Sequence, residues 1–323
     1  MSIIFTAAAT PCVAQRLELC YFSREFVFTV ASVHLAYWLR ILEITMARTQ
    51  NITLYGDIDW QLLWKNSREA KSWKSKNAGE WSQKSATFAQ RTRHSPYVRQ
   101  FLDIVAVDRE TTLLDVGCGP GTLAVPFARK VSRVTAIDYS KGMLDQLDAY
   151  ARDEGVHNIT TAQCAWEDNW DEKQIGRHDL VIASRSMNIE DPAAGIAKLQ
   201  KHASRQVVIA ERIAPTPYDP DAFAAVGRSF SSGPDYIYTV NMLHHLDIHP
   251  RIDHIELTAE PFFKNLDEDV QSYRWMFRDL SEEEERKLAR FVSSRIIRTG
   301  DDGIVIRRNH PQRWALLSWV KKT

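Results

Sequence analysis

The residues of this chain best suited to chemistry are three glycines and two acids. Gly117, Gly119 and Gly121 follow an apolar run that contains Asp115, and a second apolar run ends in Asp138, seventeen positions after the last glycine. Glycines let a loop bend sharply and approach a ligand without an intervening side chain. An acid at the end of a strand is placed to accept hydrogen bonds from ribose hydroxyls. The spacing therefore predicts a nucleotide-type cofactor site at the carboxyl ends of two parallel strands.

The position of Asp115 indicates which cofactor this loop binds. A dinucleotide site has the spacing G-x-G-x-x-G and holds a pyrophosphate, whereas here the glycines alternate and an acid lies two positions before the first. A carboxylate there is poorly suited to a pyrophosphate and well suited to the ammonium group of a sulfonium amino acid. A NAD(P) site and a glycine-rich turn in an unrelated α/β domain are the alternatives.

Two motifs in this order resemble those of class I S-adenosylmethionine-dependent methyltransferases: D-x-G-x-G-x-G, and DYSKGML at residues 138–144. The resemblance covers residues 113–211 and implies that S-adenosyl-L-methionine is the cofactor. The glycine loop would curl around its methionine portion, with Asp115 orienting it, and Asp138 would hold the ribose hydroxyls. Met143 would pack on the adenine, or else is an ordinary core residue of a helix.

The segment after the third predicted strand departs from the family pattern, because Cys164 stands where an acid often accepts from the adenine amino group. The backbone of Ala165 is expected to reach an adenine ring nitrogen, and Trp166 to flank the ring. Ser184 and Arg185 end the fourth strand and are expected beside the methionine portion. The predicted cofactor contacts are Asp115, Gly117, Cys118, Gly119, Gly121, Asp138, Tyr139, Met143, Cys164, Ala165, Trp166 and Ser184.

Catalysis of methyl transfer needs little from side chains, because the donor is already activated and collinear positioning supplies much of the acceleration. A base is needed only if the acceptor must lose a proton. The candidates for such a role are His244, His245 and Tyr97. The two histidines and Asp247 belong to a cluster that is also compatible with a metal or a purely structural role, and we expect no metal.

The segment after the fourth strand bears on the acceptor. It reads SRSMNI at residues 184–189, without the Asn/Asp-Pro-Pro-Tyr/Phe motif common in enzymes that methylate nucleobases or glutamine. Residues 186–192 resemble the corresponding segment of small-molecule methyltransferases. A small-molecule acceptor is therefore expected. The alternatives are a methyltransferase acting on RNA or protein, and a non-catalytic protein that keeps the cofactor site.

Apolar runs alternate with helical patterns through the middle of the chain, which favours a doubly wound, Rossmann-like α/β fold with a mostly parallel seven-stranded sheet. Strands are expected at residues 112–116, 133–138, 159–163, 179–184 and 206–211, and helices at 122–131, 141–154 and 193–202. Residues 304–307 and 314–320 are expected to pair with each other, with His310-Pro311 in their turn. Ser281 is expected to cap a helix over 281–293.

The domain boundaries follow from these elements. The predicted segments are an N-terminal extension at 1–45, a helical arm at 46–105, the cofactor-binding core at 106–212, an inserted cap at 213–300, and strands completing the core sheet at 301–323. Residues 1–45 are either an artefact of start-site choice, with translation beginning at Met46, or a real helix. A membrane-surface anchor is a further alternative.

Composition excludes several classes of protein. The 323 residues are 44% apolar and carry no formal net charge, so no overall field recruits nucleic acid or anionic membrane. Four cysteines without paired spacing suggest a reduced, cytoplasmic protein. The arm is locally basic, with nine Lys/Arg and two Glu between residues 65 and 99, and is read either as an electrostatic footprint for RNA or as a solvated helix whose tryptophans pack on the core.

Overall fold

The computed structural model describes residues 54–73 and 75–321, and the chain divides into two units between Ile58 and Asp59. The first unit contributes one short 3-10 helix, η1 (Tyr55–Asp57). The predicted extension at residues 1–45 lies outside the described residues. In the described part of the chain, no helix combines the length and apolarity needed to cross a membrane.

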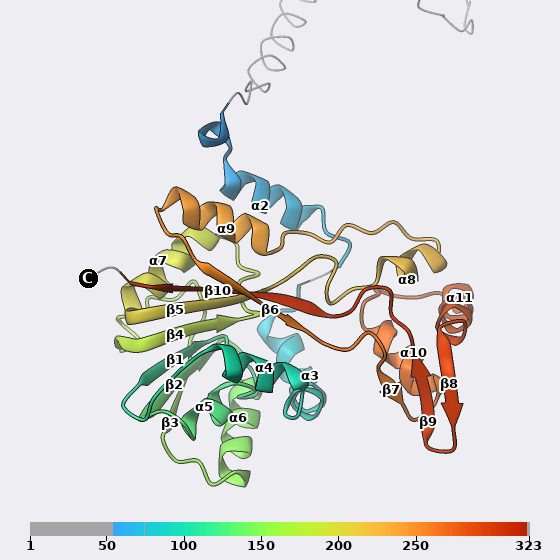
Figure 1. Cartoon of the computed structure of the whole chain (residues 1–323), viewed down its shortest axis with the longest axis horizontal. Helices are drawn as coiled ribbons and strands as arrows, with labels where there is room; N and C mark the ends of the chain where they lie inside the picture. The colour runs from blue at the N-terminus through green and yellow to red at the C-terminus, as the bar shows by residue number, and fades with distance from the viewer. Residues whose placement is uncertain (1–53, 74, 322–323) are drawn as a thin grey trace, which may run out of the picture. The chain divides into compact units, whose positions relative to one another are not determined.

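The second unit is built on a seven-stranded sheet with the order β3-β2-β1-β4-β5-β10-β6 (Figure 1). Strands β1 to β5 run parallel, and β10 lies antiparallel between β5 and β6. The predicted mostly parallel seven-stranded fold is confirmed. The bounds are β1 Thr112–Val116, β2 Arg133–Asp138, β3 Ile159–Gln163, β4 His178–Ser184, β5 Ala203–Arg212, β6 Arg251–Glu256 and β10 Arg313–Val320.

Helices cover both faces of this sheet, which explains why the central strands are apolar along their length. Tyr97, Phe127 and Leu147, from α4, α5 and α6, are buried on one face. Trp64 and Leu243, from α2 and α9, are buried with α7 on the other. The helices of the two layers are α2 Trp60–Glu69, α3 Ala78–Thr92, α4 Pro96–Ile104, α5 Ala124–Ala128, α6 Lys141–Asp153, α7 Pro192–His202 and α9 Tyr236–His245.

A smaller substructure follows β5, at the end of the sheet where the parallel strands terminate (Figure 1). It has its own apolar core, including Phe223, Tyr273, Leu288 and Ile306, and a three-stranded sheet with the order β7-β9-β8. Its elements are α8 Pro220–Ala225, β7 Phe262–Phe263, α10 Leu266–Arg274, α11 Glu282–Ser293, β8 Ile296–Gly300 and β9 Gly303–Ile306. Ser281 caps α11 as predicted, its side chain accepting from the Glu284 amide.

The predicted pairing of residues 304–307 with 314–320 is wrong. β9 pairs with β7 and β8, whereas β10 pairs with β5 and β6. The hairpin turn lies at residues 301–302, between the paired Gly300 and Gly303, and His310-Pro311 lies in the connection that leaves this small sheet for the large one. Residues 213–300, predicted as an insertion, thus also supply strand β6 of the main sheet. The other domain boundaries stay predictions.

Candidate cofactor and acceptor site

The glycine loop directly follows β1, and its three glycines all have positive φ, at 69°, 55° and 79°. A Cβ on Gly117 would lie 2.4 Å from the Cβ of Ser186, and a Cβ on Gly121 would lie 2.8 Å from the Cγ of Leu147. These two positions need glycine because neighbouring residues press against the backbone. A Cβ on Gly119 would meet nothing within 4 Å. Gly119 therefore keeps an open face in the middle of an otherwise crowded loop.

The two predicted acids lie at adjacent strand ends, since β1 pairs with β2 in parallel. Asp115 is 2% exposed, and its Oδ2 has no hydrogen-bond partner in the described structure. Burial raises the pKa of Asp115 to about 7, the nearby Asp138 adds to the rise, and the Ala124 amide and Arg185 act against it. A buried carboxylate with an unpartnered oxygen is costly unless a ligand pairs with it. Asp115 is therefore suited to pair with a cationic or hydrogen-bond-donating group.

Asp138 shapes the loop from the second strand. Its Oδ2 accepts a hydrogen bond from the Gly119 amide at 2.9 Å, and its Oδ1 accepts from the Ser140 amide at 2.8 Å. Burial also raises the pKa of Asp138, against these two hydrogen bonds. The carboxylate thus connects the glycine loop to the start of α6, where ribose hydroxyls would have to compete for it or share it.

The arm closes over the start of α6. The Ser82 hydroxyl of α3 lies 2.9 Å from the Ser140 hydroxyl and accepts a hydrogen bond from the Gly142 amide at 3.2 Å. A Cβ on Gly142 would lie 2.8 Å from the Cα of Ser82, so the small residue permits this close packing. The exposed Tyr139 donates from its hydroxyl to the Lys76 carbonyl at 2.9 Å. The arm helix α3 is therefore fixed to the motif that follows β2.

Tyr97 and Ser184 form a second cluster at the end of β4. Their hydroxyl oxygens are 2.7 Å apart, and the guanidinium of Arg185 lies 4.4 Å from the Tyr97 ring centroid. Trp314 packs edge-on against Tyr97 at 5.0 Å. Tyr97 is 1% exposed, and burial raises its pKa. Tyr97 is therefore a neutral hydrogen-bonding residue near neutral pH, and it is poorly suited to act as a base.

Arg185 is a further residue of this cluster, although it is not among the predicted cofactor contacts. Its φ is +60°, a backbone conformation that is uncommon for a residue with a side chain. Such strain persists where the surroundings over-determine it, often at functional sites. Its position immediately after Ser184 was visible in the sequence, but the backbone conformation and the stacking on Tyr97 were not.

The segment after β3, which is predicted to contact the adenine, is held by internal hydrogen bonds. The Cys164 amide donates to the Asp138 carbonyl at 3.0 Å. The Ala165 amide donates to Asp168 Oδ2 at 3.0 Å, and the Ala165 carbonyl accepts from the Trp170 indole at 2.9 Å. Both backbone groups of Ala165 thus have internal partners, and its amide would have to leave Asp168 to reach an adenine nitrogen. Asp168 thus takes part in the hydrogen bonding of this segment, although no role was predicted for it from the sequence.

Three further residues predicted to contact the cofactor, Cys118, Met143 and Trp166, have different surroundings. Cys118 is buried in the loop, its amide donating to the Ile137 carbonyl at 3.0 Å, and burial raises the pKa of its thiol. Met143 is 3% exposed on α6, as both of its predicted roles require. Trp166 packs against Trp170, with ring centroids 5.5 Å apart.

His244 and His245 are not brought to the glycine loop. Helix α9 begins near the carboxyl end of β5. The ring of Tyr236, its first residue, lies 6.4 Å from the ring of His254. His254 and Glu211, near the end of β5, both pair with Ala315 of β10. His244 and His245 come eight and nine residues after Tyr236, about 12–14 Å along the helix axis. Both are exposed, at the end of α9 far from the small sheet (Figure 1).

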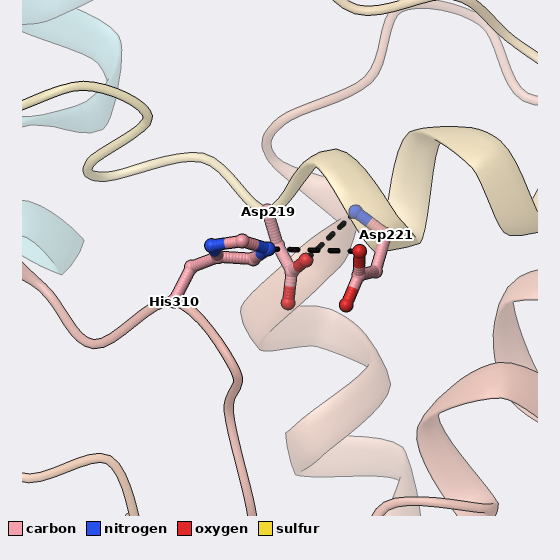
Figure 2. Close-up of side chains that lie close together, drawn as sticks. All are labelled: Asp219, Asp221 and His310. Atoms are coloured by element: carbon pink, nitrogen blue, oxygen red, sulfur yellow. Dashed lines mark hydrogen bonds and ion pairs between the residues drawn. The ribbon is translucent and has the colours of Figure 1, made fainter.

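A different cluster, Asp219, Asp221 and His310, brings potential metal ligands within 4.8 Å of one another (Figure 2). Asp219 Oδ1 accepts from the Asp221 amide at 3.0 Å and caps α8, while His310 Nε2 lies 3.5 Å from Asp221 Oδ1. Arg295 already forms an ion pair with Asp221 at 2.7 Å and lowers its pKa. These contacts join α8 to the segment after β9, so a structural role is enough to explain the cluster.

Comparison with known proteins locates the same region. A family described as a methyltransferase domain matches residues 113–206. An uncharacterized protein of Haemophilus influenzae is 34% identical over 244 residues, covering 74% of this chain and 88% of its own. A ubiquinone biosynthesis O-methyltransferase of Acinetobacter baylyi is 37% identical over 89 residues, which are 27% of this chain and 37% of that enzyme.

Among solved structures, a candidate methyltransferase from Bacillus halodurans aligns with a TM-score of 0.50 at 16% identity. The alignment covers 71% of this chain and 100% of that one. At that identity the likeness concerns the fold, and it agrees with the strand order described above.

Proposed function

The chain belongs to the class I S-adenosylmethionine-dependent methyltransferase family, and from that premise we propose that it methylates a small-molecule acceptor. As a member of the family it is a methyltransferase that uses S-adenosyl-L-methionine. The cofactor site in this proposal is supported by the buried, unpartnered oxygen of Asp115 and by the open face of Gly119. An amino-acid-bearing nucleoside cofactor has the cationic group and the bulk that these two features require.

The chain's residues fit this cofactor. Asp115 would bind its ammonium group, Asp138 its ribose hydroxyls, and the backbone at Gly119 would lie along its length. When bound, the cofactor supplies a methyl group on an electron-poor sulfonium sulfur. The residues of the chain then have to hold the acceptor in line with that methyl group and exclude water.

Tyr97, Ser184 and Arg185 are proposed to form the wall next to the reacting atoms. The Tyr97 phenol stays protonated because burial raises its pKa, so it holds Ser184 at 2.7 Å and does not remove a proton. Arg185 covers the aromatic ring at 4.4 Å. Positioning by packed side chains agrees with a reaction dominated by proximity.

The arm's cations support a small-molecule acceptor over RNA. Lys76 lies 4.9 Å from the Trp81 ring centroid. Arg93 lies 4.4 Å from the Tyr150 ring centroid and forms an ion pair with Asp153 at 3.3 Å. Cations used in internal contacts make a poorer stripe for phosphate binding. The name of the Acinetobacter relative, which refers to ubiquinone biosynthesis, points the same way.

A labelling experiment tests the proposal. The purified protein is incubated with S-adenosylmethionine labelled in its methyl group and a cell extract, and label is followed in metabolites, RNA and protein. We expect label in a low-mass product with the wild type, and much less with Asp138→Ala. Label confined to RNA or protein would contradict the small-molecule acceptor.

A further inference from the structure

A cavity of about 320 Å³ lies between the arm and the substructure that follows β5. It is lined by Arg68, Glu69, Lys71, Trp73, Ser75 and Arg278. The lining comes from α2, from the connection between α2 and α3, and from the segment after α10. Three of the six lining residues are cations and one is an acid, so the cavity is positively charged.

A fourth cation, Arg212, stands behind the lining at the end of β5. Its guanidinium carbon lies 5.1 Å from the Trp73 ring centroid, and Lys71 Nζ lies 4.7 Å from that ring. A Cβ on Gly233 would lie 2.9 Å from Lys71 Cβ and 3.2 Å from an Arg212 nitrogen. Lys71 and Arg212 thus share one small volume around Trp73.

The cations of this cluster lack some hydrogen-bond partners and repel one another. Arg212 donates to the carbonyls of Ser232 and Pro234, but its Nη1 is buried with no hydrogen-bond partner in the described structure, and the same holds for Nε of Arg68. Lys71 has its pKa lowered to about 8, first by burial and then by repulsion from Arg68, Arg212 and Arg278. An anion bound at Lys71 and Arg278 would relieve the repulsion among these cations.

Hydrogen bonds at both ends of the segment 186–188 lie between this cavity and the cofactor loop. Lys71 Nζ donates to Ser75 Oγ at 2.9 Å, and Asn188 Nδ2 donates to the same oxygen at 2.8 Å. Two residues before Asn188, the Ser186 hydroxyl donates to the Val116 carbonyl at 2.8 Å, at the start of the glycine loop. The backbone between Ser186 and Asn188 spans at most about 7 Å, and the hydrogen-bonded side chains at its two ends add to that distance.

We propose that this cavity binds a carboxylate or phosphate group of the methyl acceptor, an inference that rests on the proposed function. Lys71 and Arg278 contact the anionic group, Trp73 supports the adjoining part of the molecule, and Arg68 and Arg212 contribute positive charge. The cavity determines specificity: it selects anionic acceptors and orients the rest of the molecule toward the glycine loop.

A binding experiment tests the charge requirement directly, without catalysis. The full chain is titrated by calorimetry with benzoate, with phenyl phosphate, with neutral benzamide and with inorganic phosphate. We expect benzoate or phenyl phosphate to bind about tenfold more tightly than benzamide and inorganic phosphate. Lys71→Gln and Arg278→Gln should each remove most of this preference, and Lys65→Gln, an exposed cation of α2, should keep it. Arg278 is exposed, so its substitution is not expected to disturb folding.

Two results would overturn the inference: benzamide or inorganic phosphate binding as tightly as the better of benzoate and phenyl phosphate, or unchanged affinities in both variants. Labelled product from the extract gives a second test by anion-exchange chromatography. A retained product whose formation falls about tenfold in Lys71→Gln, with normal cofactor affinity, supports the inference. A neutral product formed equally by both proteins refutes it and leaves the proposed function standing. A wild type that binds no cofactor refutes the proposed function, and the anion titration still decides the nature of the cavity.

Discussion

The glycine loop and the basic cavity are opposite in charge and in construction. The loop buries Asp115 and Asp138, and one carboxylate oxygen lacks a partner. The cavity gathers Arg68, Lys71 and Arg278, with unpartnered nitrogens at Arg68 and Arg212. Each region holds charge that the folded chain does not neutralise, which is the expected state of a site that completes itself with a ligand. Under the two proposals, donor and acceptor would be recognised by opposite charges.

The largest expected effect is at the loop. Gly119→Arg fills the open face with a long side chain, so we expect cofactor affinity to fall by at least about a hundredfold, or about 2.7 kcal/mol. Equilibrium dialysis with labelled S-adenosylmethionine measures it. Gly155→Arg is the matched control, because Gly155 also has a positive φ, +63°, and open space around its Cβ position. Equal affinities in the two variants would mean that the loop is not where the cofactor binds.

Asp115→Asn tests the acidic region by affinity and by stability. One charge-assisted contact contributes about 1.5–3 kcal/mol, so cofactor affinity should fall by about ten- to a hundredfold. The folded pKa of about 7 lies above that of an unfolded aspartate. Ionising Asp115 therefore costs stability as the pH rises toward 7, and the cost persists above it.

The ligand-free Asn variant should consequently melt about 3–5 °C higher than the wild type at pH 8, with the gain shrinking near pH 4. Thermal unfolding followed at both pH values measures this. Asp145→Asn, an exposed position on α6, should show no such pH-dependent gain. A wild type that is more stable than Asp115→Asn at pH 8 would show that the buried carboxylate is already compensated.

A pH titration sharpens the other half of the comparison. Lys71 is protonated below its pKa of about 8, so benzoate affinity should be greatest below pH 8. It should fall by about three- to tenfold as the pH rises from 7 to 10, because the arginines keep their charge while Lys71 loses its own. In Lys71→Gln this dependence should disappear. A pH-independent affinity in the wild type would remove Lys71 from the anion site.

The smallest expected effect is at Tyr97, which meets Ser184 at the end of β4. Tyr97→Phe removes the hydroxyl that lies 2.7 Å from Ser184, and should cost about 1 kcal/mol of unfolding free energy. Ser184→Ala and the double variant complete a cycle measured by chemical denaturation. We expect kcat to change by less than about tenfold, because the phenol positions and does not transfer a proton. A much larger loss of kcat in a stable Tyr97→Phe protein would make Tyr97 a catalytic residue.

The two regions also differ in how much of them the sequence could predict. β1, β2 and β3 have the predicted bounds. The local signal is strong for β1, whose apolar run is buried inside the parallel sheet, whereas β3 is a partly exposed strand at the edge of the sheet. The acids and glycines of the loop lie within 24 positions, Asp115 to Asp138, so spacing alone brought them together. Their packing partners, such as Ser186 against Gly117, depend on tertiary structure.

The remainder depends on contacts that no local pattern specifies. Lys71, Arg212 and Arg278 come from three distant parts of the chain and meet only around Trp73. Similarly, the sequence correctly predicted a strand near residues 304–307, but it did not identify β7 and β8 as the strands that pair with it. His244 and His245 are conspicuous in the sequence, but they lie at the end of α9, which runs away from the loop.

Calorimetric titration of the wild type and of Asp138→Ala with S-adenosylmethionine tests the central claim, that the loop after β1 is the methyl-donor site. We predict one binding site per chain in the wild type and an affinity at least about tenfold lower in the folded Asp138→Ala variant, because a carboxylate that accepts ribose hydroxyls is lost. Equal affinities in the two proteins, or no binding by folded wild type, would contradict the account.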